Sequence, residues 1–228
     1  MNNALAVRKI VSACEKQLDW SARDPDYASY VSLPLCILDA VFSINAKYES
    51  VTKKVVARYA QYCEQQVGFD PGEQEQPVGG FLELVNALGP SRFAAEVLRN
   101  RQRTSARSGI LKAEAAASYA AVLIQFGVQR FTDVPKIIDS DRFCRRIRAI
   151  PGQVLALDYF LMLVGRDDLI KGDRMVLRFL GRCLEGAAVK PYEALDLLTA
   201  ATEALRETRP TLTPRLLDWM IWQHEHQS

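Results

Sequence analysis

The chain has 228 residues, a formal net charge of +2, and hydrophobic and charged contents of 49% and 25%. These values are ordinary for a soluble globular protein that can bury a core. The longest apolar runs fall far short of the about 20 residues that a transmembrane helix needs, and the N-terminal residues show no basic-then-apolar export signal. We therefore expect a cytoplasmic protein with no membrane contact.

The apolar residues follow a helical spacing nearly throughout. Residues 5–14 form a first amphipathic helix, and an irregular connection leads to Ser32, a predicted N-cap with Pro34 in the first turn. Residues 68–80, rich in Gly and Pro, form a loop. No strand alternation is present, so the sequence predicts an all-α fold. Further helices are predicted over residues 51–62, 81–88, 92–98, 112–126, 132–138, 141–149, 155–164, 192–206 and 214–222, and one begins at residue 173.

The cysteines and histidines show no metal-ligand pattern. No two cysteines lie at a ligand spacing, and their odd number argues against a disulfide framework. His224 and His226 lie in a C-terminal tail that we expect to be solvated. We therefore predict no metal site, neither zinc nor iron–sulfur, and no cofactor. The five cysteines are Cys14, Cys36, Cys63, Cys144 and Cys183.

Charge is distributed unevenly along the chain. Residues 92–112 carry six basic side chains and one acid, and residues 136–148 carry five basic side chains and two acids. Residues 64–83 carry five acids and no base. This separation favours a protein with one face for a polyanion. The alternative is a set of solvated helix faces with no ligand.

A Pro-Gly turn joins two predicted helices at Ile150-Pro151-Gly152-Gln153. A turn of this kind can present backbone N–H groups to a phosphate, and the following helix N-terminus strengthens such a site. The alternative is an ordinary glycine-containing connection between helices.

Asp173 follows Gly172 and precedes an apolar-periodic segment, Met175 to Leu180. An Asp at this position predicts a helix N-cap. Capping fixes the direction of a carboxylate and is therefore compatible with catalysis, but a cap needs no second role.

Three separated blocks of sequence give these two features a context. The first block, residues 42–53, is an apolar helix end that carries Asn45; the second, residues 108–114, reads Ser-Gly-Ile-Leu-Lys-Ala-Glu; the third is the Pro-Gly turn followed by Asp173. In order and spacing, over roughly residues 32–182, they resemble the helix-hairpin-helix DNA glycosylase superfamily, the endonuclease III-like group.

The resemblance implies a two-lobed helical fold with a helix-hairpin-helix element and a cleft between the lobes. Residues 32–165 would form the central lobe, which ends in the hairpin, and residues 1–31 with 166–228 would form the second lobe.

The resemblance also implies roles for individual residues. Asn45 matches the residue that probes the DNA stack, and Asp173 matches the catalytic carboxylate. Pro151, Gly152 and Gln153 match the start of the hairpin that grips the DNA backbone. The predicted phosphate contacts are Arg101, Arg103, Arg107 and Lys112, and the aromatic residues considered for a base pocket are Tyr48, Tyr159 and Trp20.

The chain departs from the family pattern at several positions. Val154 stands where family hairpins have a second glycine, and the segment from Pro151 to Gly165 is about two residues shorter than a family hairpin. Residues 154–159 contain no lysine, so an amine attack on the sugar is disfavoured. The C-terminal cysteine cluster of some members is also missing, since no cysteine follows Cys183. The chain therefore resembles a divergent, monofunctional member.

We accordingly expect a monofunctional DNA N-glycosylase of base excision repair. It would extrude a base from double-stranded DNA and use Asp173 to assist hydrolysis of the N-glycosidic bond. It would act as a monomer in the cytoplasm, associated with the nucleoid when bound to DNA. Two alternatives stay open: a DNA-binding protein of the same fold without catalysis, and a helical protein-interaction module.

Overall fold

The structure, a computed structural model, describes residues 3–21, 30–68 and 75–227. Within these residues the chain forms helices joined by turns, with one isolated antiparallel bridge between Arg103 and Leu111 and no strand. The prediction of an all-α fold is confirmed. In the same described part, no helix is both long enough and apolar enough to cross a membrane.

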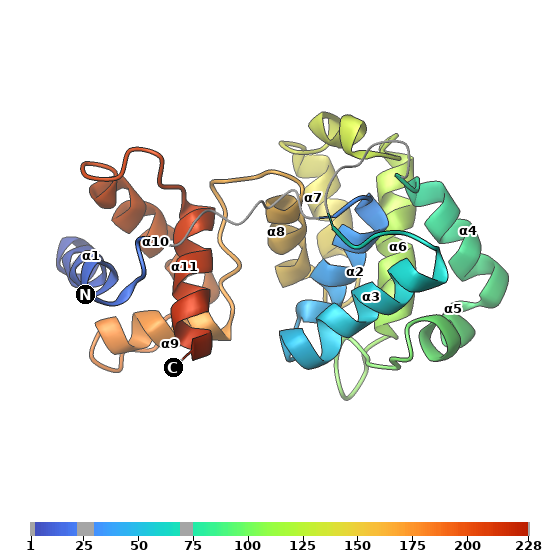
Figure 1. The fold of residues 1–228 in the computed structure, drawn as a ribbon, viewed down its shortest axis with the longest axis horizontal. Helices are drawn as coiled ribbons and strands as arrows, with labels where there is room; N and C mark the ends of the chain where they lie inside the picture. Colours follow the sequence, from blue (N-terminus) through green and yellow to red (C-terminus); the bar gives the residue numbers. More distant parts are fainter. Residues whose placement is uncertain (1–2, 22–29, 69–74, 228) are drawn as a thin grey trace. The chain divides into compact units, whose positions relative to one another are not determined.

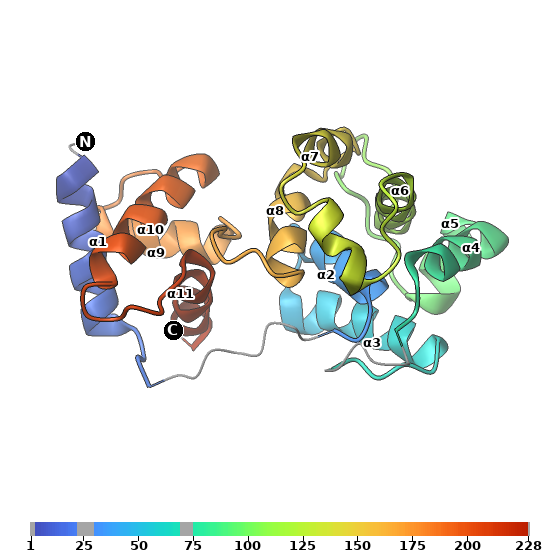
Figure 2. The ribbon, with the colours of Figure 1, turned by 90° about the horizontal axis from the view of Figure 1, so that it is seen from above.

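The chain divides into two compact units. The central unit is Asp26–Gly165, and the terminal unit combines Met1–Pro25 with Arg166–Ser228. Figure 1 and Figure 2 show the helices of each unit, with α2 to α8 in the central unit and α1 with α9 to α11 in the terminal unit.

Two residues that the sequence analysis grouped with the termini belong to the central unit. Tyr30 and Val31 are both buried, and the Tyr30 hydroxyl donates to Asp39 Oδ2 at 2.6 Å. These contacts attach the segment before Ser32 to the central unit, so the first boundary lies earlier than the predicted one at residues 31 and 32.

The core of the central unit is α2 (Leu33–Ser43), which is buried at every position from Leu33 to Phe42. This run is apolar except for Asp39, and a helix that is apolar on all sides is stable only when other elements cover it. Several of the helices listed next pack against α2. The unit also contains η1 (Tyr48–Thr52), α3 (Lys53–Tyr62), α4 (Val78–Leu88), α5 (Pro90–Arg92), η2 (Phe93–Val97), α6 (Lys112–Gln125), η3 (Phe131–Lys136), α7 (Asp141–Arg148) and α8 (Val154–Leu163).

The start of α2 lies where Ser32 and Pro34 predict it. Ser32 has the extended backbone of an N-cap residue, and Pro34 lies in the first turn, where its missing N–H costs no hydrogen bond. The Ser32 hydroxyl does not cap the helix; it donates to Gln65 Oε1 at 2.9 Å. The helix is therefore held at this end by burial and by a contact with the chain after α3.

Lys112 closes the other end of α2. Its Nζ donates to the carbonyl oxygens of Phe42 and Ile44, at 3.1 and 2.6 Å. The last carbonyls of a helix have no intrahelical donor and carry partial negative charge, so an ammonium group stabilises them. Lys112 is only 4% exposed. Lys112 is therefore not placed to contact a phosphate, as was predicted, because its ammonium group donates to backbone carbonyls inside the unit.

The terminal unit contains α1 (Asn3–Gln17), α9 (Arg174–Cys183), α10 (Pro191–Leu205) and α11 (Pro214–Gln227). Each contributes apolar residues to one core, such as Ile10 from α1, Phe179 from α9, Leu198 from α10 and Leu217 from α11. The termini of the chain thus build a second core of their own.

The buried position of Lys112 predicts a pH effect on stability. Burial lowers the pKa of Lys112 to about 8 from a usual value of 10.5. The folded chain then holds fewer protons at this lysine than the unfolded chain above pH 8, so stability rises with pH in this window. We expect the free energy of unfolding of the wild type to rise, relative to that of Lys112→Met, by about 1.5 kcal/mol between pH 8 and pH 9.5. Urea denaturation at each pH measures this difference, and parallel curves would contradict a buried ammonium.

Candidate functional site

The Pro-Gly turn connects α7 to α8 in the central unit. Its bonds are local: the Ile150 N–H donates to the carbonyl of Ile147 at 3.0 Å, and the Gln153 N–H donates to the carbonyl of Ile150 at 3.1 Å. Gly152 has a φ of +77°, in the left-handed region that favours glycine. Pro151 and Gly152 are both exposed. The turn therefore lies at the surface in one defined conformation.

The three turn residues differ in what they can offer a phosphate. Pro151 has no N–H, and Gln153 uses its own N–H within the turn. The Gln153 side chain is buried, at 1% exposed, and makes no capping bond to α8. Gly152 and the uncapped first turn of α8 are therefore the groups that could contact an anion here. Gln153, which was predicted to contact the DNA backbone, therefore offers a phosphate neither its N–H nor its side chain.

Residues 99–111 form a loop that carries the predicted arginines. The Thr104 N–H donates to the carbonyl of Ile110 at 2.9 Å, and the Lys112 N–H donates to the carbonyl of Gln102 at 2.8 Å. These bonds hold the two sides of the loop together. Arg103 adds a bond from Nη1 to the carbonyl of Gly109 at 2.7 Å. The three predicted arginines of this loop, Arg101, Arg103 and Arg107, are exposed, and so is Arg99 at its start.

The arginine loop packs directly against the Pro-Gly turn. A Cβ atom added to Gly152 would lie 2.7 Å from the Cβ of Thr104, which is closer than real Cβ contacts. Only a glycine fits between the turn and the loop. The structure thus brings together two segments that lie about 50 residues apart in the sequence and that the resemblance links to DNA.

Asn45 lies close to the same loop. It is exposed, with a φ of +52°, an uncommon conformation that Asn adopts more readily than most residues. The carbonyl of the preceding Ile44 accepts from Lys112, whose Nζ also approaches Gln102 Oε1 at 3.4 Å. Lys112 therefore links the segment of Asn45 to the base of the arginine loop.

Two of the predicted base-pocket aromatics meet at a buried carboxylate. The hydroxyls of Tyr48 and Tyr159 each lie 3.3 Å from Asp39 Oδ2, and the hydroxyl of Tyr30 lies 2.6 Å from the same oxygen. Burial, followed by the negative charge of Asp39, raises the pKa of Tyr30 and of Tyr48 well above the usual value. Both phenols therefore stay protonated and can donate to the carboxylate.

Trp20 belongs to the terminal unit. Its Nε1 donates to the carbonyl of Cys14 at 3.2 Å, and the guanidinium of Arg209 lies 3.8 Å from the ring centroid. This ring is held within its own unit by a hydrogen bond and a cation–π contact. The three predicted aromatics are therefore divided between the units.

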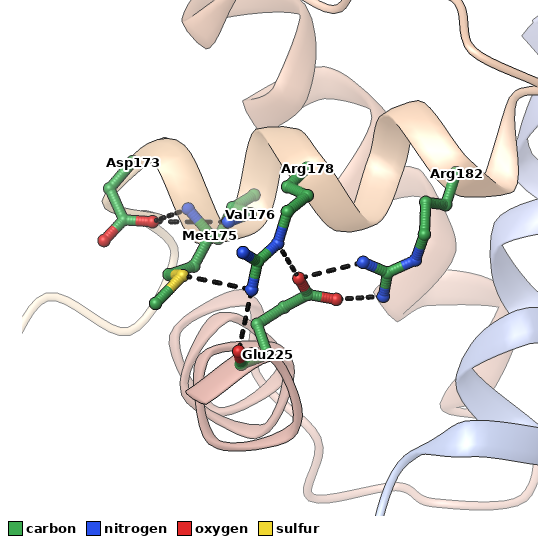
Figure 3. Close-up of polar contacts among 6 residues, drawn as sticks. All are labelled: Asp173, Met175, Val176, Arg178, Arg182 and Glu225. Carbon is green, nitrogen blue, oxygen red and sulfur yellow. Dashed lines mark hydrogen bonds and ion pairs between the residues drawn. The ribbon is translucent and has the colours of Figure 1, made fainter. Parts of the chain in front are cut away.

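Asp173 is the N-cap of α9, as its position in the sequence predicts. Its Oδ1 accepts hydrogen bonds from the N–H groups of Met175 and Val176, at 2.8 and 3.2 Å (Figure 3). The residue is half-buried, so its carboxylate is not sealed in the interior. The second oxygen points away from the start of the helix in Figure 3. The cap thus fixes the direction of the carboxylate while one oxygen is turned outward.

One buried acid of α11 that holds α9 was not predicted from the sequence. Glu225 is 2% exposed and pairs with the guanidinium groups of Arg178 and Arg182, two residues one turn apart on α9 (Figure 3). Arg178 Nη2 also donates to the backbone carbonyl of Glu225 at 2.7 Å. Burial raises the pKa of Glu225, but hydrogen bonds from Arg182 and Arg178 outweigh it and leave the pKa lowered.

The predicted C-terminal tail is part of α11, which continues to Gln227. His226 is exposed, as predicted for a solvated residue, whereas His224 is half-buried and its ring meets that of Phe179 edge-on at 6.2 Å. The apolar stripe with Trp219 and Ile221 predicts that this helix docks on the core, and Ile221 lies in the core of the terminal unit with Trp219 packed against it.

The close approach at Gly152 predicts that a side chain there lowers stability in two ways, through backbone strain and through overpacking. A glycine of similar φ with open space around it measures the first contribution alone. Gly127, just after α6, has a similar φ of +72°, and an added Cβ there meets nothing within 4 Å. We expect Gly127→Ala to lower the free energy of unfolding by about 1 kcal/mol, through backbone strain alone. Gly152→Ala should cost about 3 kcal/mol, because overpacking against Thr104 adds to that strain.

A double variant completes the test of this contact. Thr104→Gly removes the atom that the new methyl group meets, so Gly152→Ala in that background should cost about as much as Gly127→Ala. Urea denaturation of the wild type and of the four variants gives the measurement. Equal losses for the two single glycine variants would show that the loop and the turn do not touch.

Searches among curated proteins and among solved structures find no match. A family model matches residues 8–226. This range runs from α1 to α11 and therefore includes helices of both units. The chain belongs to this family, which is described as a domain of unknown function (DUF8548).

Proposed function

We propose that this protein binds double-stranded DNA through its central unit and hydrolyses the N-glycosidic bond of a damaged or modified base. The observation that carries the proposal is the packing of the arginine loop against the Pro-Gly turn, where Thr104 leaves room for no side chain at Gly152. A basic loop beside an exposed turn and an uncapped helix start matches what a phosphate backbone needs.

Binding begins with charge. Arg101, Arg103 and Arg107 are exposed and keep their charge at any physiological pH. Their contacts to phosphates position the duplex without selecting a sequence. The N–H of Gly152 and the first N–H groups of α8 add hydrogen bonds to a phosphate beside the loop.

Asn45 then stabilises the opened stack. Its side chain stands at the end of α2, exposed, on a segment that Lys112 fixes through the carbonyl of Ile44. An amide at that place can donate to and accept from the orphaned partner base. The extruded base stacks on aromatic side chains, for which Tyr48 and Tyr159 are available in the central unit, each oriented by its bond to Asp39.

Asp173 supplies the chemistry. As the bond between the sugar carbon and the base nitrogen stretches, its electron pair leaves with the base and positive charge grows on the sugar. The Asp173 carboxylate stabilises that charge and orients the water that adds to the sugar carbon, and the departing base takes up the proton that this water loses. Residues 154–159 offer no lysine for attack on the sugar, so the protein has glycosylase activity and no lyase activity. It works as a monomer in the cytoplasm, on the nucleoid when bound.

A second candidate is a DNA-binding protein that has kept the fold without the chemistry. The observation in its favour is the altered turn: Val154 replaces a glycine and is 55% exposed, and Gln153 withholds its N–H from a ligand. Under this alternative the affinity for DNA remains and no base is released.

The arginines predict a measurable salt dependence. The logarithm of the association constant for a synthetic duplex should fall linearly with the logarithm of salt concentration. Arg101→Ala and Arg107→Ala should each weaken binding and reduce the slope by about 1, because each removes one phosphate contact. Arg8→Ala is the control, since Arg8 is an exposed arginine on α1, outside the proposed interface. A flat salt dependence of the wild type excludes both DNA proposals.

Asp173→Asn separates capping from catalysis. Asn caps a helix about as well as Asp, so the variant should fold normally and its affinity for DNA should stay within about threefold. Release of the base should fall by at least about 100-fold, because the charge that stabilises the sugar is gone. Mass spectrometry of bases released from DNA with alkylated, oxidised, deaminated and hypermodified bases gives the measurement.

The control for this comparison is Asp196→Asn, which removes an exposed carboxylate from α10 of the same unit. It should leave base release unchanged. If the wild type binds DNA and releases none of these bases, the second candidate replaces the first.

A further inference from the structure

A second carboxyl group is buried beside the backbone that leads to Asp173. Asp218 lies on α11 and is only 5% exposed, between the buried side chains of Leu217 and Met220 in sequence. Its Oδ1 accepts a hydrogen bond from the N–H of Lys171 at 3.1 Å. Lys171 precedes Asp173 by two residues, so Asp218 holds the chain at the entrance to the N-cap.

Further contacts fix the rest of this short connection. Gly172 has a φ of +57°, and a Cβ added to it would lie 3.5 Å from the carbonyl oxygen of Pro191 at the start of α10. Asp173 itself is tied to α9 by its two capping bonds. The segment from Lys171 to Asp173 is thus held by α11 on one side and by α9 on the other, within one compact unit.

The charges around Asp218 favour its protonated form. Burial, followed by the negative charge of Asp173, raises the pKa of Asp218 to about 7, against a smaller lowering by the Lys171 N–H and the Lys171 ammonium. α10, which also packs against α11, adds the buried apolar residues Leu198 and Ala201 to the shared core. Asp218 therefore keeps its proton to a higher pH than an exposed aspartate does.

We propose that Asp218 is a positioning residue for Asp173, which anchors the backbone of the catalytic carboxylate and keeps a proton next to it. This inference rests on the proposed function of Asp173. While Asp218 is protonated, it accepts from Lys171 and leaves Asp173 as the single anion that faces the sugar. When Asp218 loses its proton, its carboxylate and that of Asp173 repel each other, and this repulsion destabilises the segment from Lys171 to Asp173.

The sign of the pH effect on stability follows from the raised pKa. The folded chain holds more protons at Asp218 than the unfolded chain between about pH 4 and pH 7, so this stabilisation is complete below pH 4 and is lost as pH rises through 7. The melting temperature of the wild type should fall by roughly 5–10 °C from pH 5 to pH 8, relative to that of Asp218→Asn. Asn keeps an oxygen that accepts from Lys171 and carries no charge at any pH.

Two further variants of the full chain make this measurement specific. Asp173→Asn removes the neighbouring charge, so the midpoint of the fall in melting temperature should move to lower pH. Glu225→Gln removes the other buried acid of α11, which pairs with arginines of α9. It should lower the melting temperature throughout pH 5 to 8 and leave the dependence on pH in this range as in the wild type. An unchanged midpoint in Asp173→Asn would sink the inference, even if Asp218→Asn fails to fold.

Base release provides the second readout. The rate for the wild type at saturating DNA should fall as pH rises from 6 to 8.5, and the rate for Asp218→Asn should stay level over the same range. Identical pH profiles for the two proteins would overturn the positioning role. If the wild type releases no base, the proposed function fails and the positioning role fails with it, whereas the melting curves still decide whether the two carboxyl groups are coupled.

Discussion

The central unit depends on one buried ammonium group. Lys112 Nζ binds the last carbonyls of α2, the most deeply buried helix, and its backbone N–H closes the base of the arginine loop through Gln102. One residue therefore binds the end of the core helix, fixes the place of Asn45 and closes the loop that faces solvent. A buried cation is costly unless its donors are used, and here helix-terminal carbonyls use them. Lys112 therefore connects the core of the central unit to the arginine loop.

In the terminal unit, buried acids hold a helix in place, as the buried ammonium of Lys112 does in the central unit. Asp218 and Glu225 are seven residues apart on α11, two helical turns, so they lie on one face. The first binds the chain just before α9, and the second binds two arginines along it. Both ends of α9 are therefore held by buried acids. The capping bonds fix the Asp173 carboxylate on α9, and the buried acids fix α9 against α11.

The sequence predicted the helices and the cap at Asp173 well, since spacing and capping are local properties. It could not predict the partner of Lys112, because the carbonyls that it binds lie about 70 residues away in sequence. Asp39 gave a signal that went unused: one acid inside the apolar run of α2 must be buried and needs donors from elsewhere. Glu225 gave no signal, because a polar sequence near a C-terminus looks the same whether it is solvated or paired.

The burial of Lys112 also explains why arginines carry the proposed interface. A compact ammonium suits a cluster of carbonyls, but in this place burial lowers its pKa to about 8, so its charge would be lost in mild alkali. Guanidinium groups stay charged and offer several donors each. Lys112 lies inside the unit, and the exposed Arg101, Arg103 and Arg107 give the loop its positive surface. Its attraction for a polyanion should therefore vary with salt and very little with pH.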